Sequence, residues 1–419
     1  MVDTAIMGHL SQSHLGAIAI GTQIFNLIYW NFGFLRMGTS GFTAQAYGAR
    51  RLDEAVRIFI RAFAVALMIA AVLILLQYPI ALLSELIFKS SPSVLSLALS
   101  YFFVRIWAAP ATLGLYAIKG WFIGMQNSKL PMWIALLINI VNIICSLLFV
   151  VVLHWDIRGV ALGTVIAQYS GLTVGLFFVS LRYGKLFRAR LSLQFIREAL
   201  QWRQMKDFFS VNGDIFLRTI CLATVFTFIT AQSGRISDSI LAVDALLLQF
   251  FTLFSYIMDG FAYAGESLVG RYIGAQDRRS LLSSVRHLIA WGVGLTLLFT
   301  VLYAAFGQQF LLIFSDKQDV ISATKPYFFW TLIIPVCGFS AFLFDGIFIG
   351  ATASRTMRNT MFIATLAFFA VWYLLSVSLN TDSEFVQNNI LWSAFMVYLT
   401  SRGLGQAMML RKSVYNKIK

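Results

Sequence analysis

The chain has 419 residues, of which 59% are hydrophobic and only 12% are charged. This charged fraction is about half of the roughly 25% that is typical of soluble globular domains. The composition therefore excludes an ordinary soluble domain. The formal net charge is +14, but the basic residues are spread over many separate loops, so we expect no nucleic-acid partner.

Charge-free apolar runs recur along the chain and predict membrane-spanning helices. The clearest cover residues 62–84, 130–153, 159–181 and 288–315. Each exceeds the roughly 20 apolar residues that cross a bilayer as a helix, and none has the polar stripe of a soluble amphipathic helix. With turn residues as boundaries, we expect eleven complete spans, at residues 15–45, 59–82, 96–124, 130–153, 159–181, 207–231, 239–270, 287–314, 327–351, 359–378 and 387–410. The pattern predicts an all-α polytopic membrane protein with the lipid bilayer as its surroundings.

The distribution of basic residues predicts an orientation in the membrane. Counted from the loop at 46–58, the odd-numbered loops and the C-terminal end hold 22 of the 32 Lys and Arg residues, whereas the intervening loops hold 5. Cytoplasmic loops of membrane proteins carry the excess of Lys and Arg. We therefore expect the basic loops and the C-terminus to be cytoplasmic.

Three short words recur at one constant offset of 226 residues, which indicates an internal repeat. They are Tyr-Phe-Phe at 101–103 and 327–329, GWFIG at 120–124 with GIFIG at 346–350, and Gly-Ala at 48–49 and 274–275. A single short apolar word often recurs by chance in a membrane protein. Three words at the same offset predict two homologous halves.

The repeat also gives an interpretation of the opening residues, MVDTAIMGHL. The same shift aligns Thr4, Ala5 and Gly8 with residues that close the span at 207–231. We therefore expect the opening residues to be the end of a first helix that is truncated in this chain. The expected architecture has twelve helices in two pseudo-symmetric six-helix bundles, related by an axis along the membrane normal. The expected domains are residues 1–181, a basic cytoplasmic linker at 182–206, and residues 207–419.

Charged side chains inside the expected spans are candidate functional residues. A charge at the bilayer centre costs at least about 2.5–3.5 kcal/mol on insertion scales. Asp214 and Arg218 lie four residues apart on one helix face, where they can pair. Asp259 and Glu266 lie seven apart, again on one face, and Asp345 lies within the word FLFDGIFIG.

Each of these candidates has a structural alternative. Asp214 and Arg218 could neutralise each other as a structural pair. Asp259 and Glu266 could lie near the interface and reach water. Asp244 is interpreted first as an end-of-helix residue, because it lies near the start of its span.

Four residues are candidates for the lining of a substrate cavity. The repeat aligns Lys119 with Asp345, although a lysine side chain can also extend to the membrane surface. Arg36 could pair with an acidic residue or cap a helix end. Tyr29 and Trp30 could line an apolar cavity and offer cation–π contacts, with lipid-facing packing as the alternative.

Buried carboxyl groups of this kind are suited to the capture of a proton or a cation. Desolvation raises the pKa of a carboxyl group, so the group can be neutral when enclosed and ionised when wetted. No metal site or catalytic residue is expected, because Cys145, Cys221 and Cys337 lack CxxC spacing and the four histidines form no HExxH motif. We expect no cofactor beyond H⁺ or Na⁺ as a coupling ion.

Several motifs resemble those of one transporter family. VDTAIMGHL followed by FLRMGTSGFTAQAYGA resembles the first two helices of the multidrug and toxic compound extrusion (MATE) transporters. NGDIFLRT at 212–219, MDGFAYAGESLVGRYIGA at 258–275 and LFDGIFIGATASRTMRN at 343–359 resemble the DinF-like branch of that family. The resemblance runs from residue 2 to about residue 405.

The resemblance implies a function. It implies twelve helices around a central cavity, and export of organic cations or amphiphilic drugs in exchange for H⁺ or Na⁺ by alternating access. It implies that Asp3, in the VDT motif, is a central coupling residue, with further acidic groups at Asp214, Asp259 or Glu266, and Asp345. For the DinF-like branch it implies coupling to protons. Lys119 has no role that the resemblance assigns.

Two other functions compete with export. A flippase for lipid-linked precursors, from the same superfamily, would need a large cavity lined by arginines, whereas the candidates here are mainly acidic. A membrane-embedded enzyme would need a metal motif or a nucleophile–base pair, and the sequence has neither. We therefore expect a monomeric multi-pass transporter of the bacterial inner membrane, with small cationic or amphiphilic molecules as partners.

Overall fold

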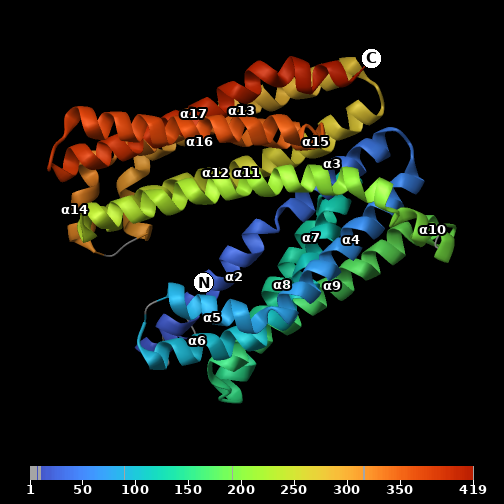
Figure 1. Cartoon of the computed structure of the whole chain (residues 1–419), viewed down its shortest axis with the longest axis horizontal. Helices are drawn as coiled ribbons and strands as arrows, with labels where there is room; N and C mark the ends of the chain where they lie inside the picture. Colours follow the sequence, from blue (N-terminus) through green and yellow to red (C-terminus); the bar gives the residue numbers. More distant parts are fainter. Residues whose placement is uncertain (1–6, 8–10, 89, 191, 315–316, 419) are drawn as a thin grey trace. The chain divides into compact units, whose positions relative to one another are not determined.

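A computed structural model describes residues 7, 11–88, 90–190, 192–314 and 317–418. In this part of the chain the secondary structure is helical, and there is no strand. Ten helical segments are long and apolar enough to cross a membrane. The chain divides into two units (Figure 1). Unit 1 comprises the described residues within 1–43 and 51–209, and unit 2 those within 44–50 and 210–419.

Unit 1 is a bundle in which α4 packs against α7, α8 against α9, and α2 against α6. Its apolar core includes Phe25, Phe102 and Ile106, all of which are fully buried. The elements are α2 (Gln12–Asn31), α3 (Phe34–Gly48, whose last residues belong to unit 2), α4 (Leu52–Leu75), α5 (Gln77–Ile87), α6 (Pro92–Arg105), η1 (Ile106–Ala108), α7 (Ala109–Gly124), α8 (Lys129–Leu147), η2 (Leu148–Val152), α9 (Asp156–Arg188) and α10 (Leu193–Ala199).

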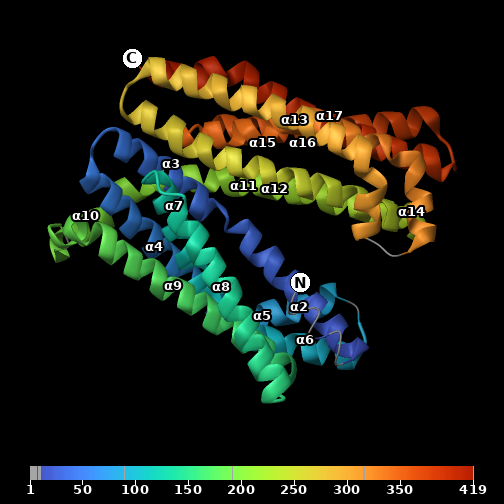
Figure 2. The same ribbon diagram turned by 180° about the vertical axis from the view of Figure 1, so that it is seen from behind.

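Unit 2 is a second bundle, whose long helices run side by side in both views (Figures 1 and 2). In it, α12 packs against α13 and α15, and α17 packs against α15 and α16. The elements are α11 (Trp202–Ile236, whose first residues belong to unit 1), α12 (Asp238–Gly274), α13 (Arg278–Phe314), α14 (Gln318–Thr324), η3 (Lys325–Tyr327), α15 (Phe329–Gly350), α16 (Ser354–Leu379), α17 (Glu384–Ser413) and η4 (Tyr415–Lys417).

The expected spans all fall on helices, but several helices are longer than the apolar runs. The expected linker at 182–206 is largely helical, because it contains the end of α9, all of α10 and the start of α11. The helical hydrogen-bond ladder continues past the apolar run, since backbone pairing does not require an apolar side chain. Conversely, the expected span at 15–45 is broken at residues 32–33, between α2 and α3. The eleventh expected span coincides with α17, which is not among the ten most apolar segments.

The 226-residue repeat is also a repeat of backbone conformation. Arg50 and Gln276 follow the ends of α3 and α12, and both have positive φ, at 56° and 55°. Gln126 and Thr352 follow the ends of α7 and α15, with φ of 62° and 49°. Each pair is separated by 226 residues. A left-handed residue just past a helix end satisfies the last carbonyl groups of that helix, so both halves end these helices in the same way.

Close helix approaches repeat as well. A Cβ added to Gly120 of α7 would meet the backbone of Arg36, and one added to Gly346 of α15 would meet the backbone of Ala262. Both members of the second contact lie 226 residues after those of the first. Glycine permits such a backbone approach because it has no Cβ. The structure thus confirms the repeat that the short sequence words predict.

Candidate functional site

Unit 2 encloses several buried carboxylates, and Asp345 of α15 is held by two arginines. Its Oδ2 accepts hydrogen bonds from Arg218 of α11 and Arg402 of α17, and its Oδ1 accepts one from Gln406 Nε2 at 2.8 Å. Asp345, Arg218 and Arg402 are at most 6% exposed. The charge of Asp259 on α12 also acts on Arg402. Two cations and two anions therefore meet in the interior of this bundle.

Asp214 of α11 has different partners from those the sequence suggests. Its Oδ1 lies 2.6 Å from Nη1 of Arg358, and its Oδ2 accepts a hydrogen bond from the hydroxyl of Ser354 at 2.8 Å. Both partners belong to the first turns of α16. The expected pairing of Asp214 with Arg218 is therefore not the one adopted, since each residue pairs with a different neighbouring helix.

Asp244 of α12 is another buried carboxylate, 2% exposed. It accepts hydrogen bonds from the side chains of Asn388 and Trp392 on α17, at 3.0 and 2.7 Å, and its Oδ2 lies 2.5 Å from the hydroxyl oxygen of Ser233 on α11. Within the described part of the chain it forms no ion pair. The interpretation of Asp244 as an end-of-helix residue understates its surroundings, because three helices enclose it.

The other acidic candidate of α12 is Glu266, which is 1% exposed. Its backbone lies against Gly350 at the end of α15. Asp259, one of the four charged groups around Asp345, is only partly buried. Asp259 and Glu266 are thus both at the α12–α15 contact or next to it, which their shared helix face predicted.

In unit 1 the structure brings two basic candidates together. The charge of Arg36 on α3 acts on Lys119 of α7, and the backbone of Arg36 lies close to the residue after Lys119. Tyr29 is 8% exposed and stacks on a phenylalanine, whereas Trp30 is 48% exposed. Asp3 lies outside the described residues.

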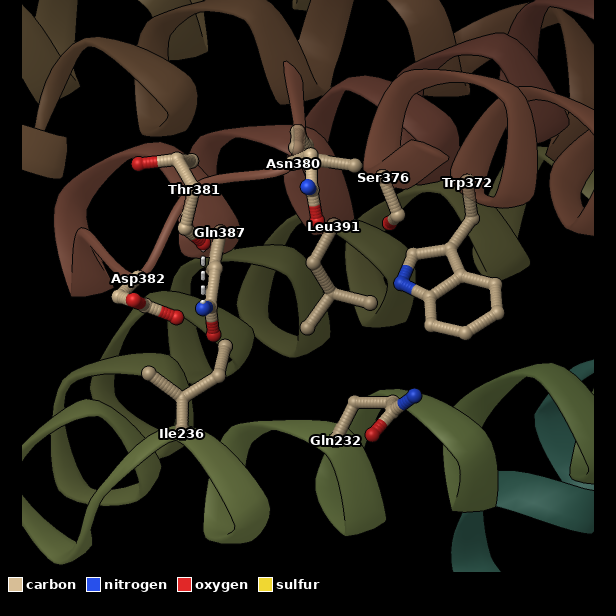
Figure 3. A pocket seen from close by; sticks show the side chains of 10 residues that line it. Gln232, Ile236, Trp372, Ser376, Asn380, Thr381, Asp382, Gln387 and Leu391 are labelled. Atoms are coloured by element: carbon tan, nitrogen blue, oxygen red, sulfur yellow. Dashed lines mark hydrogen bonds between the residues drawn. The ribbon is translucent and has the colours of Figure 1, made fainter. Parts of the chain in front are cut away.

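A polar pocket lies in unit 2 between the end of α11, the end of α16 and the start of α17 (Figure 3). Its volume is about 270 Å³. Gln387 donates a hydrogen bond from Nε2 to the carbonyl of Thr381 across its wall, at 2.9 Å. Its ten lining residues include one acidic side chain, Asp382, and no basic one: Gln232, Ile236, Trp372, Ser376, Asn380, Thr381, Asp382, Gln387, Ile390 and Leu391.

Sequence reasoning misses two residues of these clusters. It places Arg402 with the basic C-terminal end and Arg358 with a basic loop, so it treats neither as a buried partner. Arg402 occurs in the run FMVYLTSRGLGQAMML, and its position in an otherwise uncharged stretch is a usable signal. In the described part of the chain, the side chains of Cys, His, Asp and Glu form no group of three or more that could hold a metal ion.

Comparison with known proteins gives a consistent result. The family model MatE matches residues 1–148 and 215–374. DNA damage-inducible protein F of Escherichia coli (strain K12) is 34% identical over 98% of this chain and 87% of its own length. Multidrug resistance protein MdtK of Edwardsiella ictaluri is 21% identical over 98% of this chain and 90% of its own.

Solved structures share the fold. A crystal structure of MATE in the bent conformation has a TM-score of 0.85 and 18% identity, and the match covers 100% of this chain and 92% of that one. The Vibrio cholerae MATE transporter VcmN in the bent form has a TM-score of 0.82 and 17% identity, over 99% of this chain and 92% of that one.

Proposed function

The chain belongs to the MATE family of multi-pass membrane transporters, and from this membership we propose its transport activity. We propose that it is a secondary active transporter that exports organic cations or amphiphilic drugs in exchange for protons, by alternating access. It performs no covalent chemistry. The naming of relatives such as MdtK as multidrug resistance proteins supports this substrate class.

The observation that carries the proposal is the charge network in the interior of unit 2. Asp345 and Asp214 lie on helices that are apolar enough to span a membrane, yet both residues are at most 6% exposed. Charges in such a place are costly, and they mark ion or substrate pathways. Each carboxylate has a partner on another helix, so a movement of those helices changes the pairing of the charge and its access to water.

The competing flippase function is less well supported. The two buried arginines of unit 2, Arg218 and Arg402, both point at Asp345, so neither is available to bind an anionic headgroup. The described pocket contains an acidic side chain and no basic one. These features favour cationic or zwitterionic solutes over anionic lipids.

Protons are the proposed coupling ion, with Na⁺ as the alternative. A carboxylate that changes partners can bind a proton when it loses its cation and release it when the cation returns. We assign such roles to Asp3, Asp214, Asp259, Glu266 and Asp345, together with Arg218 as the counter-charge of Asp345. Tyr29, Trp30, Arg36 and Lys119 remain proposed cavity residues.

The proposed location is the bacterial inner membrane, with a monomeric chain. The excess of Lys and Arg in alternate loops and at the C-terminal end supports a cytoplasmic C-terminus. Cysteine accessibility measured from each side of intact cells, after replacement of the three native cysteines, tests this orientation.

Transport in everted membrane vesicles tests the proposal. After a proton gradient is established, addition of ethidium should release protons from vesicles that contain the chain, and this release should be lost in Asp345→Asn and Asp3→Asn. Asp53→Asn, which removes an exposed carboxylate paired with Arg190, is the matched control. Dye uptake that ignores the proton gradient but follows a Na⁺ gradient would reverse the choice of coupling ion. Dye movement with neither gradient would overturn the proposed function.

A further inference from the structure

The hydrogen bonds around Asp244 require more hydrogen atoms than an ionised carboxylate allows. Its Oδ1 accepts hydrogen bonds from Trp392 Nε1 and Asn388 Nδ2. Its Oδ2 lies 2.5 Å from Oγ of Ser233, and that same Oγ lies 2.8 Å from the backbone carbonyl oxygen of Ile229. Both contacts of Ser233 are at hydrogen-bond distance.

A serine hydroxyl has a single hydrogen, so it cannot donate to two acceptors at once. The carbonyl of Ile229 can only accept. If Asp244 is ionised it too can only accept, and one of the two oxygen–oxygen contacts of Ser233 then has no hydrogen between its atoms. If Oδ2 of Asp244 carries a proton, Asp244 donates to Ser233 and Ser233 donates to Ile229. Only the protonated form satisfies every contact.

We propose that Asp244 is a protonated carboxyl group in this conformation, and that Asp244, Ser233 and the Ile229 carbonyl form a proton-binding site of unit 2. A metal cation does not fit this site, because Oδ1 faces two N–H donors and N–H groups cannot ligate a cation. This proton-binding site is separate from the charge network of Asp345. Gly346 lies against Ala262, which is 18 residues, or about 27 Å, further along α12 than Asp244.

The neighbouring titratable groups add no positive charge to the site. Tyr327 of η3 lies against Asn388 and feels the charge of Asp244, and Glu384 at the start of α17 acts on Tyr327 in turn. Glu384 accepts a hydrogen bond from Ser237 at 3.0 Å. Arg235 of α11 and Lys325 of η3 are exposed, and neither forms an ion pair with Asp244 among the described contacts. A buried carboxyl group without a counter-charge favours its neutral form.

The polar pocket adjoins this proton-binding site. Gln232 lines the pocket next to Ser233 in sequence, and Gln387 and Leu391 line it next to Asn388 and Trp392. The pocket therefore flanks, on the other side of α11 and α17, the residues that enclose Asp244 (Figure 3). A small rotation of either helix would bring Asp244 toward the water-accessible pocket. That the proton is then released and used for exchange rests on the proposed function, whereas its presence here rests on the contacts alone.

Infrared spectroscopy of the purified protein tests the bound proton without any transport assay. At neutral pH the carbonyl stretching band of a protonated carboxyl group should be present, should disappear in Asp244→Asn, and should persist in Asp214→Asn, because Asp214 is paired with an arginine. Absence of the band at neutral pH, or a band that Asp244→Asn leaves unchanged, would overturn the proposal.

Thermal unfolding gives a second, independent measurement. The amide introduced by Asp244→Asn would reproduce the protonated form, since its NH₂ donates to Ser233 while its oxygen accepts from Asn388 and Trp392. Asp244→Asn should therefore change the unfolding temperature by less than about 2 °C, whereas Asp244→Leu should lower it clearly. Equal destabilisation by both substitutions would show that the ionised form is required. A positive infrared result with negative vesicle transport would leave the proton site standing and remove only the proposed function.

Discussion

Arg218 of α11 forms a buried ion pair with Asp345 of α15, although Asp214 lies one helical turn away on its own helix. Asp214 pairs instead with Arg358 at the start of α16. The two pairs connect α11 to two different helices of unit 2. These interhelical pairs make the positions of α15 and α16 dependent on charges carried by α11.

Removal of the Asp345 carboxylate should be strongly destabilising. Asp345→Asn leaves Arg218 and Arg402 buried without their common anion, and loss of one partner of a buried ion pair costs about 3–5 kcal/mol. Unfolding of the purified protein in detergent measures this loss. Asp53→Asn, whose side chain is 63% exposed, should cost less than about 1 kcal/mol. Equal stability of the two variants would contradict the buried pairing.

The Asp214 cluster should respond in a graded way. Ser354→Ala removes one neutral donor and should cost about 1 kcal/mol, whereas Arg358→Gln removes a charged donor and should cost about 2 kcal/mol. Arg355→Gln is the matched control, because Arg355 is exposed in the same turn of α16. Denaturation of the three variants and of the double variant gives the coupling energy between Ser354 and Arg358. An effect of Arg355→Gln as large as that of Arg358→Gln would count against the assigned partner.

The close approach of α12 and α15 should not tolerate a side chain at Gly346. A Cβ there would meet the backbone of Ala262, and such overpacking costs about 1–3 kcal/mol. Gly260 on α12 has no atom within 4 Å of the corresponding Cβ position. Gly260→Ala should therefore be neutral or stabilising by up to about 1 kcal/mol, because alanine favours the helix. Thermal unfolding compares the two, and a harmless Gly346→Ala would contradict the close packing.

The N-terminus of α13 should fray at acid pH. Asp277 accepts a hydrogen bond from the backbone N–H of Ser280 at 3.0 Å, and hydrogen bonds from Ser280 hold the pKa of Asp277 below its usual value. A depressed folded-state pKa stabilises the folded form above the unfolded-state value of about 3.9, and this contribution is lost as the pH falls through the lower folded-state pKa.

Hydrogen exchange in the first turn of α13 measures this effect. After correction for intrinsic rates, protection in the wild type should decrease on acidification through the range of Asp277. In Asp277→Asn it should change little, because an asparagine caps a helix without titrating. The same acid dependence in both proteins would show that another group is responsible.

Much of the architecture follows from local pattern. The length of each apolar run predicts a span, because a helix must satisfy its backbone hydrogen bonds internally to cross a bilayer. The 226-residue words predict two homologous halves, which the matching left-handed turn residues Gln126 and Thr352 confirm. Helix ends were less predictable, since α9 and α13 continue beyond their apolar segments.

The sequence by itself determined the membrane class, the repeat and the family, together with the short set of acidic residues that lie inside spans. Only the tertiary structure decided which charges meet. Spacing along one helix places Asp214 and Arg218 on a common face, but the partner of each depends on which neighbouring helix presents a complementary group at the same depth. Likewise, Asp244 becomes a proton-binding candidate only when Ser233 and Trp392 enclose it from two other helices. Such contacts arise from helix packing and register, which no single stretch of sequence contains.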